Sequence, residues 1–106
     1  MKNYGLIRTG AAVPVVRIAD VEYNAAEICR IADEAFEKEV SLVVFPELSL
    51  TGYSCGDLFA MNPLVKSAED GIRRILEYSR GKAMTIVVGA PIPYRSKLYD
   101  CAVVIR

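Results

Sequence analysis

The pattern of hydrophobic and polar positions changes along the chain. Short apolar runs that predict strands alternate with stretches of helical spacing that predict helices. Residues 11–18 are rich in β-branched side chains and predict a strand. Over residues 22–39, apolar residues recur at helical spacing and charged residues occupy the opposite face, which predicts an amphipathic helix. A nearly continuous apolar run over residues 41–45 predicts a strand that is covered on both faces. Pro46 ends this run, and Glu47 follows it.

The second half of the chain repeats this alternation. Asn62-Pro63 is a helix-start signal, because Asn can cap a helix and Pro fits its first turn, and helical spacing continues to about residue 79. Residues 85–90 predict a third strand, residues 91–97 a hairpin-like connection, and residues 98–105 a fourth strand. Strands that alternate with helices predict an α/β fold with a mainly parallel sheet and two helices.

Right-handed crossovers would place both helices on the same face of the sheet. Between the second strand and the second helix, residues 48–57 predict a loop and residues 57–61 a short helical turn. The other face of the sheet is therefore expected to be apolar and uncovered. Because the pattern also stops on a strand, residues 1–106 are interpreted as the N-terminal piece of a larger domain.

Composition narrows the classes of function. Thirteen Lys and Arg balance thirteen Asp and Glu, and 53% of the residues are apolar, which excludes both a disordered chain and a basic nucleic-acid-binding protein. No apolar run approaches the roughly 20 residues that a membrane span needs. The N-terminal stretch Met1–Arg8 has no signal-peptide pattern. The protein is therefore expected to be cytoplasmic, with no nucleic-acid or membrane partner.

The chain contains no histidine and three cysteines. The lack of histidine removes the commonest general base and most zinc sites, and no Cys-x-x-Cys motif or phosphate-binding glycine fingerprint is present, so no metal site is predicted. Cys29 and Cys101 are interpreted as core residues. Cys55 lies near Glu47 in the sequence and is a weak candidate nucleophile, because no helix N-terminus or fixed cation that would favour its thiolate is evident nearby.

Glu47 occupies a position at which α/β proteins commonly place their chemistry. It follows an apolar strand of a predicted parallel sheet, and ligands bind at the carboxyl ends of such strands. A carboxylate at this place would be partly desolvated and could act as a general base. The alternative is an exposed loop glutamate that caps a nearby turn. Its position alone leaves both interpretations open.

The stretch Phe45–Tyr53 contains Phe-Pro-Glu followed by Thr-Gly-Tyr, and it resembles the first signature of the nitrilase, or carbon–nitrogen hydrolase, superfamily. Asn24 near the start of the first helix and the two strands at 86–91 and 98–105 match further features, so the resemblance covers essentially the whole chain. It implies an α-β-β-α sandwich, of which this chain is the N-terminal part. It also implies amide hydrolysis by a Glu–Lys–Cys triad.

Carried over residue by residue, the resemblance makes Glu47 the catalytic base and places Tyr53 beside the substrate pocket, as a substrate-binding residue. The lysine of the triad would follow the strand at 98–105, and the cysteine would come later still. No lysine in the sequence stands at the matching position. The 106 residues alone are therefore expected to be inactive.

The extension Thr51–Phe59 is similar to one branch of the superfamily, in which a glutamine-hydrolysing domain supplies ammonia to an ATP-dependent synthetase domain that amidates deamido-NAD⁺. This resemblance implies glutamine, ATP and deamido-NAD⁺ as substrates. ATP and Mg²⁺ would bind the synthetase domain, and no cofactor is expected in this chain. The alternatives are another amidase of the superfamily and a non-enzymatic chain that self-associates through its bare sheet face. A homo-oligomer is expected.

Overall fold

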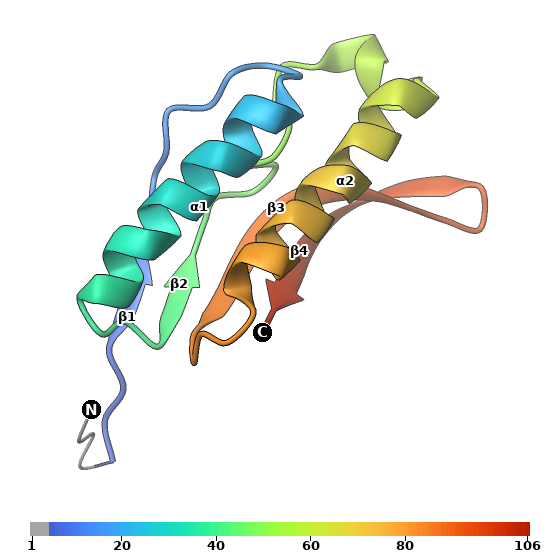
Figure 1. Ribbon diagram of the computed structural model, residues 1–106. Coiled ribbons are helices and arrows are strands. Elements are labelled where there is room, and N and C mark those ends of the chain that lie inside the picture. Colours follow the sequence, from blue (N-terminus) through green and yellow to red (C-terminus); the bar gives the residue numbers. More distant parts are fainter. Residues whose placement is uncertain (1–4) are drawn as a thin grey trace.

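A computed structural model describes residues 5–106 (Figure 1). The first four residues of the N-terminal stretch analysed above for a signal peptide lie outside the described residues. In the described part the elements follow one another in the order β1 (Thr9–Ala11), α1 (Val21–Glu37), β2 (Leu42–Val44), the 3₁₀ helix η1 (Gly56–Ala60), α2 (Asn62–Ser79), β3 (Thr85–Tyr94) and β4 (Lys97–Ile105).

The described strands form one sheet in the order β1-β2-β3-β4. β2 pairs in parallel with both β1 and β3, whereas β3 and β4 form an antiparallel hairpin. The register places Ala11, Val44, Val87 and Val104 side by side in one row across the sheet. The predicted α/β fold with a mainly parallel sheet is therefore confirmed.

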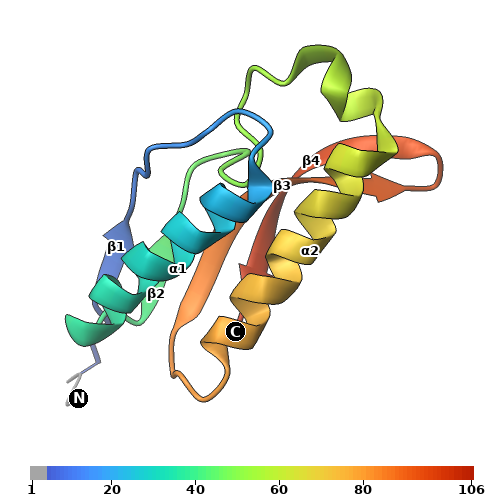
Figure 2. The same cartoon turned by 45° about the horizontal axis from the view of Figure 1, so that its top comes forward.

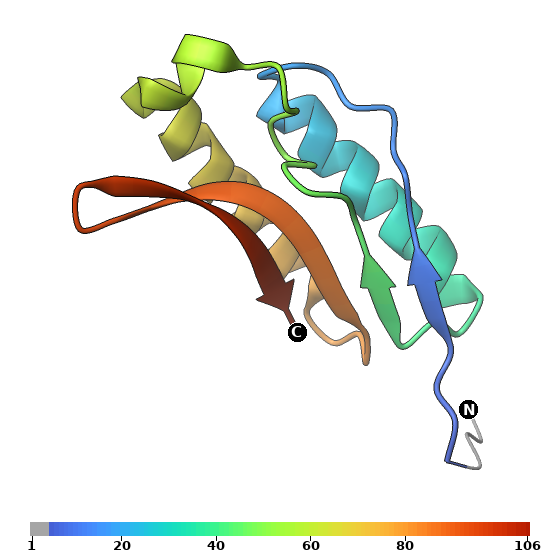
Figure 3. The same ribbon diagram turned by 180° about the vertical axis from the view of Figure 1, so that it is seen from behind.

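Both α-helices lie on one face of this sheet (Figures 1 and 2). Seen from behind in Figure 3, the opposite face has no helix over it. The core lies between the helices and the sheet, where Ile28 and Ile75 of the helices and Ile86 of β3 are fully buried. A Cβ at Gly71 would lie 2.7 Å from Cγ1 of Val21, so the lack of a side chain there lets α2 approach α1 closely.

The helix boundaries agree with the predicted ones to within about two residues, and their caps differ. Asp20 caps α1, and its carboxylate accepts a hydrogen bond of 3.1 Å from the Tyr23 amide. Asn62 does not cap α2 as predicted. Met61 takes the N-cap position without a side-chain hydrogen bond, and Asn62 and Pro63 are the first two helical residues.

The strand predicted over residues 11–18 is wrong beyond its first residue. The Ala12 amide still donates to the Val44 carbonyl at 2.9 Å, but β2 ends at Val44 and offers no further partner. Pro14 has no amide hydrogen to continue a ladder. The backbone of Arg17 instead bonds to the side chain of Asn24.

The connection predicted over residues 91–97 is also wrong, because β3 continues to Tyr94 and the turn contains only Arg95 and Ser96. Both turn residues have positive φ angles, as in a two-residue hairpin turn of type I′. The amide of Gly89 points away from β4, toward Ser49. Pro91 and Pro93 lie two and four residues further along β3, so their nitrogens also point away from β4. Because β2 has already ended on that side, an amide hydrogen at these positions would have no strand partner, and the prolines interrupt no hydrogen bond of the sheet.

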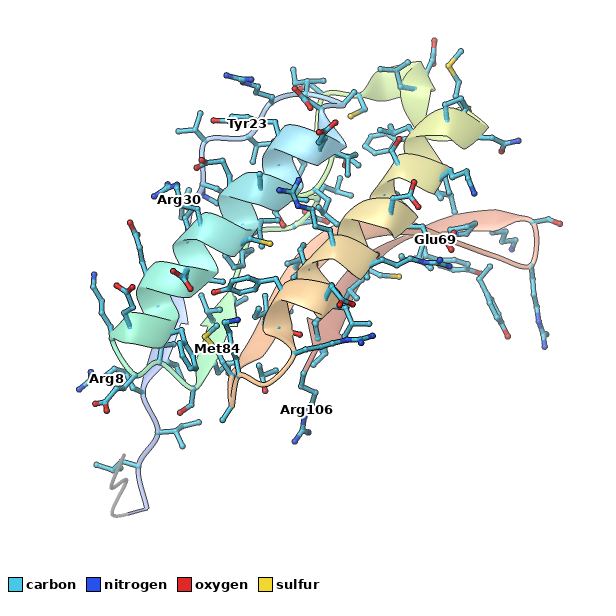
Figure 4. All side chains as sticks on the ribbon, in the orientation of Figure 1. Arg8, Tyr23, Arg30, Glu69, Met84 and Arg106 are labelled. Atoms are coloured by element: carbon cyan, nitrogen blue, oxygen red, sulfur yellow. The ribbon has the colours of Figure 1, made fainter. Side chains whose placement is uncertain are left out.

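The outer side of the helical layer is charged. Figure 4 shows Arg30 on α1 and Glu69 on α2 among these side chains. Arg30 forms ion pairs with Glu27 at 3.0 Å and Glu34 at 3.2 Å, all on α1. Across residues 5–106, no helix combines the length and apolar character that crossing a membrane requires.

Candidate functional site

The loop that follows β2 folds back onto β3 and is held there by hydrogen bonds. The Phe45 amide donates to the Val87 carbonyl at 2.8 Å and continues the parallel pairing for one residue beyond β2. The chain then turns, and the Leu50 amide donates to the Gly89 carbonyl at 3.1 Å. The Gly89 amide donates to Oγ of Ser49, also at 3.1 Å. Both backbone groups of Gly89 therefore bind the loop that carries Glu47.

Gly89 lets this loop lie directly against β3. A Cβ at this position would overlap the Leu48 nitrogen and would lie 2.7 Å from the carbonyl carbon of Glu47. Ile86 and Val88 are buried beneath the helices, so the alternation along β3 points position 89 to the opposite face. Glu47 and Leu48 therefore lie over the sheet face that no helix covers.

Asn24 holds the same loop from the helical side. Its side chain is 2% exposed, and its Nδ2 donates to the carbonyls of Arg17 at 2.8 Å and Leu50 at 2.9 Å. Its Oδ1 accepts from the Arg17 amide at 2.8 Å. One buried amide side chain thus joins the segment before α1, α1 itself and the loop after β2.

Glu47 stands at the carboxyl end of β2, as predicted, and borders a cavity of about 310 Å³. The cavity lies on the uncovered face, and its other walls include Val44, Val87, Asp100 and Ala102. The expectation that the carboxylate is partly desolvated is wrong for the described chain, because Glu47 is exposed. The reason is that the sheet face beneath it carries no second layer.

Tyr53 does not border this cavity, but its phenol lies near enough to Glu47 to be affected by the charge of the carboxylate. The pKa of Tyr53 is raised above its ordinary value, first by partial removal of the phenol from water and then by the nearby Glu47 carboxylate. A nearby carboxylate opposes ionisation of the phenol, which explains the direction of the shift. The structure therefore brings together the two residues that the family resemblance assigns to the site.

Ser49, Gly89 and Asp100 are not among the site residues predicted from the sequence. A glycine within an apolar strand marks a close approach by another backbone, so Gly89 could have been found in this way. Ser49 carries no comparable signal, because nothing in its neighbours along the chain indicates that its hydroxyl would reach β3. Asp100 borders the Glu47 cavity only because the β3–β4 register places it near Gly89.

The cysteines do not gather beside Glu47. Cys55 is buried, and its thiol hydrogen-bonds to the Thr51 carbonyl at 3.1 Å. Cys29 is half-buried against the core, and this burial raises the pKa of its thiol. Cys101 borders the cavity and is only half-buried. Its position along β4 places its side chain on the same face as Val103 and Ile105, which is the helix-facing side of the sheet. The described residues hold no cluster of three or more Cys, Asp or Glu that could bind a metal ion.

Comparison with known proteins identifies the family of the chain. The profile of the family described as carbon–nitrogen hydrolase matches residues 9–106. A glutamine-dependent NAD⁺ synthetase of Mycobacterium leprae is 36% identical over 104 residues, which are 98% of this chain and 15% of the relative. A glutamine-dependent NAD⁺ synthetase of Aquifex aeolicus is 35% identical over 89 residues, which are 84% of this chain and 15% of that relative. The chain thus spans only about 15% of the length of these relatives.

Solved structures agree with the sequence comparison. The crystal structure of a glutamine-dependent NAD⁺ synthetase from Cytophaga hutchinsonii superposes with a TM-score of 0.80 at 30% identity, over 93% of this chain and 17% of the other. An amidase from Nesterenkonia sp. superposes with a TM-score of 0.72 over 83% of this chain and 33% of the other, and its 23% identity supports a shared fold alone.

Proposed function

Because the chain belongs to the carbon–nitrogen hydrolase family, we propose that it is the part of a glutamine-hydrolysing domain that contributes the general base, Glu47. Its sheet with two helices on one face is one part of a nitrilase-like sandwich. The observation that carries the proposal is the loop geometry: Gly89 and Asn24 hold the backbone around Glu47 at the carboxyl end of β2, and its side chain borders a cavity.

The proposed reaction is hydrolysis of the glutamine side-chain amide. Glu47 takes the proton of a cysteine thiol, whose sulfur attacks the amide carbon, and a lysine stabilises the oxyanion that forms. Glu47 then returns the proton to the departing ammonia, and water releases the acyl group from sulfur. No lysine of residues 5–106 borders the Glu47 cavity. We therefore assign the lysine and the cysteine to other parts of the whole protein, so that these 106 residues contribute only the glutamate.

We propose that the whole protein is a glutamine-dependent NAD⁺ synthetase, the enzyme named for the relatives that match 98% and 84% of the chain. The ammonia would pass to a synthetase domain that amidates deamido-NAD⁺ with ATP and Mg²⁺, as a step of NAD biosynthesis. Tyr53, whose phenol is affected by the Glu47 charge, would contact the bound glutamine. Residues 1–106 would then form the N-terminal part of the glutaminase domain.

The surface of the protein and its cysteines support proposals about its partners and its location in the cell. The uncovered apolar sheet face supports a homo-oligomer of residues 1–106 on their own, whereas in the whole sandwich the second sheet would cover this face. The balanced charge of thirteen cations and thirteen anions argues against a nucleic-acid partner. Cys29, Cys55 and Cys101 are free thiols, which suits the reducing cytoplasm.

The amidase alternative is compatible with the family of the chain and with the fold that it shares with the Nesterenkonia amidase. A synthetase needs both glutamine and deamido-NAD⁺, whereas a simple amidase releases ammonia from an amide without either ATP or a dinucleotide. Measuring ammonia release and NAD⁺ formation in the same reaction separates these two functions.

The proposal is tested by Glu47→Gln in the full-length protein. This change keeps the size of the side chain but removes the base, so the glutamine-dependent activity should fall by at least ~10²-fold. Activity with free ammonia should be retained, because amidation of deamido-NAD⁺ does not need this carboxylate. Glu39→Gln, at an exposed position beyond α1, is the matched control. Equal loss of both activities in Glu47→Gln would contradict the proposed role.

A further inference from the structure

We propose that Ser49 is a positioning residue, whose hydrogen bond to the Gly89 amide holds Glu47 in the orientation that amide hydrolysis requires. This inference rests on the proposed function, because it assigns Ser49 a role in that reaction. A positioning role and a purely structural role of Ser49 predict different results. If Ser49 positions Glu47, loss of the hydroxyl should move the Glu47 carboxylate while the sheet and the helices keep their fold.

The hydroxyl of Ser49 takes the place of a backbone acceptor that the neighbouring strand does not supply to β3. β2 ends at Val44, so the Gly89 amide has no backbone carbonyl of β2 opposite it. Oγ of Ser49 accepts this amide at 3.1 Å, and the side chain is 1% exposed. Water does not reach this place, and a buried amide without a partner is strongly unfavourable. The hydroxyl is therefore a required acceptor at a fixed point of the sheet.

Glu47 lies between two such fixed points. On one side, the Phe45 amide donates to the Val87 carbonyl at 2.8 Å. On the other side is Ser49, whose own amide also donates to the Pro46 carbonyl at 3.2 Å and closes the turn. Glu47 and Leu48 are the two residues at the centre of this turn.

The turn is held in a conformation that it would not keep unaided. Leu48 has a φ of 51°, in the left-handed region that a branched side chain rarely adopts. Gly89 lies so close beneath it that the backbone has no room to relax toward β3. Without the Ser49 hydroxyl, the turn can only move away from β3, and the Glu47 carboxylate moves with it.

Thr51 provides a matched control in the same loop. It is 0% exposed, and its hydroxyl donates to the carbonyl of the adjacent Gly52 at 3.2 Å. This hydroxyl therefore bridges to no other strand. Thr51→Val removes a buried hydroxyl at the same depth as Ser49→Ala does, but it leaves the contact between the loop and β3 intact.

The first measurement is the kinetics of the full-length protein with glutamine as the substrate. Ser49→Ala should lower kcat by ~10- to 100-fold, because a displacement of about 1 Å can cost this much, while KM for glutamine and the ammonia-dependent activity stay near their original values. Ser49→Thr keeps the acceptor oxygen and should recover most of kcat. Thr51→Val should leave kcat unchanged. A kcat for Ser49→Ala equal to that of Thr51→Val would overturn the inference.

The second measurement reports the position of Glu47 without any turnover. The Glu47 carboxylate raises the pKa of the Tyr53 phenol, so NMR titration of Tyr53 reports whether the carboxylate has moved away from the phenol. Ser49→Ala should lower the pKa of Tyr53, and Thr51→Val should not. Should Ser49→Ala fail to fold, Ser49→Cys keeps the volume with a weaker acceptor and should show the same two changes. An unchanged titration in the Ser49 variants refutes the positioning role, whereas full glutaminase activity of Glu47→Gln refutes the proposed function itself.

Discussion

The Glu47 carboxylate acts on the Tyr53 phenol through its negative charge, although the chain turns twice between the two residues. The second turn depends on Gly52, which has a φ of 86° and whose amide donates to the Leu48 carbonyl at 2.7 Å. An L-residue rarely adopts this backbone conformation, so glycine suits the position. The Thr-Gly-Tyr sequence therefore has a geometric role: it returns a phenol to the glutamate that precedes it.

Glu47→Gln should lower the pKa of Tyr53. The carboxylate raises this pKa because its negative charge opposes ionisation of the phenol, and the amide has no charge. Part of the rise should remain, because partial desolvation of the phenol is its largest cause. NMR titration of labelled tyrosine, with the signal assigned by Tyr53→Phe, measures the change. Asp57→Asn, which neutralises another exposed carboxylate of this loop, should leave the Tyr53 titration as it was.

Gly89→Ala should destabilise the fold and disrupt the Glu47 loop together. The added methyl group would overlap the Leu48 nitrogen and lie 2.7 Å from the Pro46 oxygen, and these are backbone atoms that cannot rotate away. The expected cost in the free energy of unfolding is at least about 2 kcal/mol, measured by thermal or urea unfolding. Gly10→Ala is the matched control, because its methyl group would meet Val40 at 3.7 Å, an ordinary contact. Equal stabilities of the two variants would contradict this packing.

The elements of the fold could be predicted because their signals are local. Helical spacing defines α1 and α2, and the apolar run before Pro46 defines β2. The errors came from contacts between distant segments. Pro91 indicates a turn when only its neighbours are considered, but β3 continues through it because β2 has already ended. The sequence pattern does not show at which residue of β3 the pairing with β2 stops.

The site could be predicted only in part for the same reason. The position of Glu47 after an apolar strand is visible in the sequence, and the family resemblance adds Tyr53. The contact of Ser49 with Gly89 joins residues forty positions apart, and Asp100 reaches the cavity through the hairpin register. The exposure of Glu47 also depends on tertiary structure, because it follows from a sheet face without a second layer.

Asn24→Asp should destabilise the protein most at neutral pH. The Asn24 amide donates to two carbonyls at a 2% exposed position, and a carboxylate there would face both oxygens without a hydrogen to donate. Its folded-state pKa would be raised above the unfolded value of about 3.9, so stability is lost as pH rises through the folded pKa. The expected cost at pH 7 is about 3 kcal/mol, with partial recovery toward pH 4.

Asn62→Asp is the control for this prediction. It introduces the same charge at an exposed position in the first turn of α2, where the helix dipole favours an anion. Urea unfolding at pH 7 and pH 4 should show little change for Asn62→Asp. A pH dependence of Asn24→Asp that resembles this control would show that the three hydrogen bonds of Asn24 do not hold the loop.

The sheet face opposite the helices is apolar and open to solvent. In the row that crosses the four strands, Val44 is 40% exposed and Val104 is 60% exposed. Val13 and Val15, in the segment after β1, are also exposed, at 86% and 75%. Burial of apolar surface stabilises association by about 25 cal/mol per Å², so this face favours contact with a second apolar surface.

The 106-residue chain should therefore self-associate through this face, and Val104→Lys should weaken the association. Burying one valine side chain contributes about 1.5 kcal/mol or more, so its replacement by a charged side chain should raise the dissociation constant by at least about tenfold. Leu76→Lys, at a 41% exposed position on the helical layer, is the control and should leave the dissociation constant unchanged. Sedimentation over a range of concentrations measures both. A monomer with a sharp, concentration-independent thermal transition would contradict the assignment of this face as an interface, because its apolar row would then be stable in water.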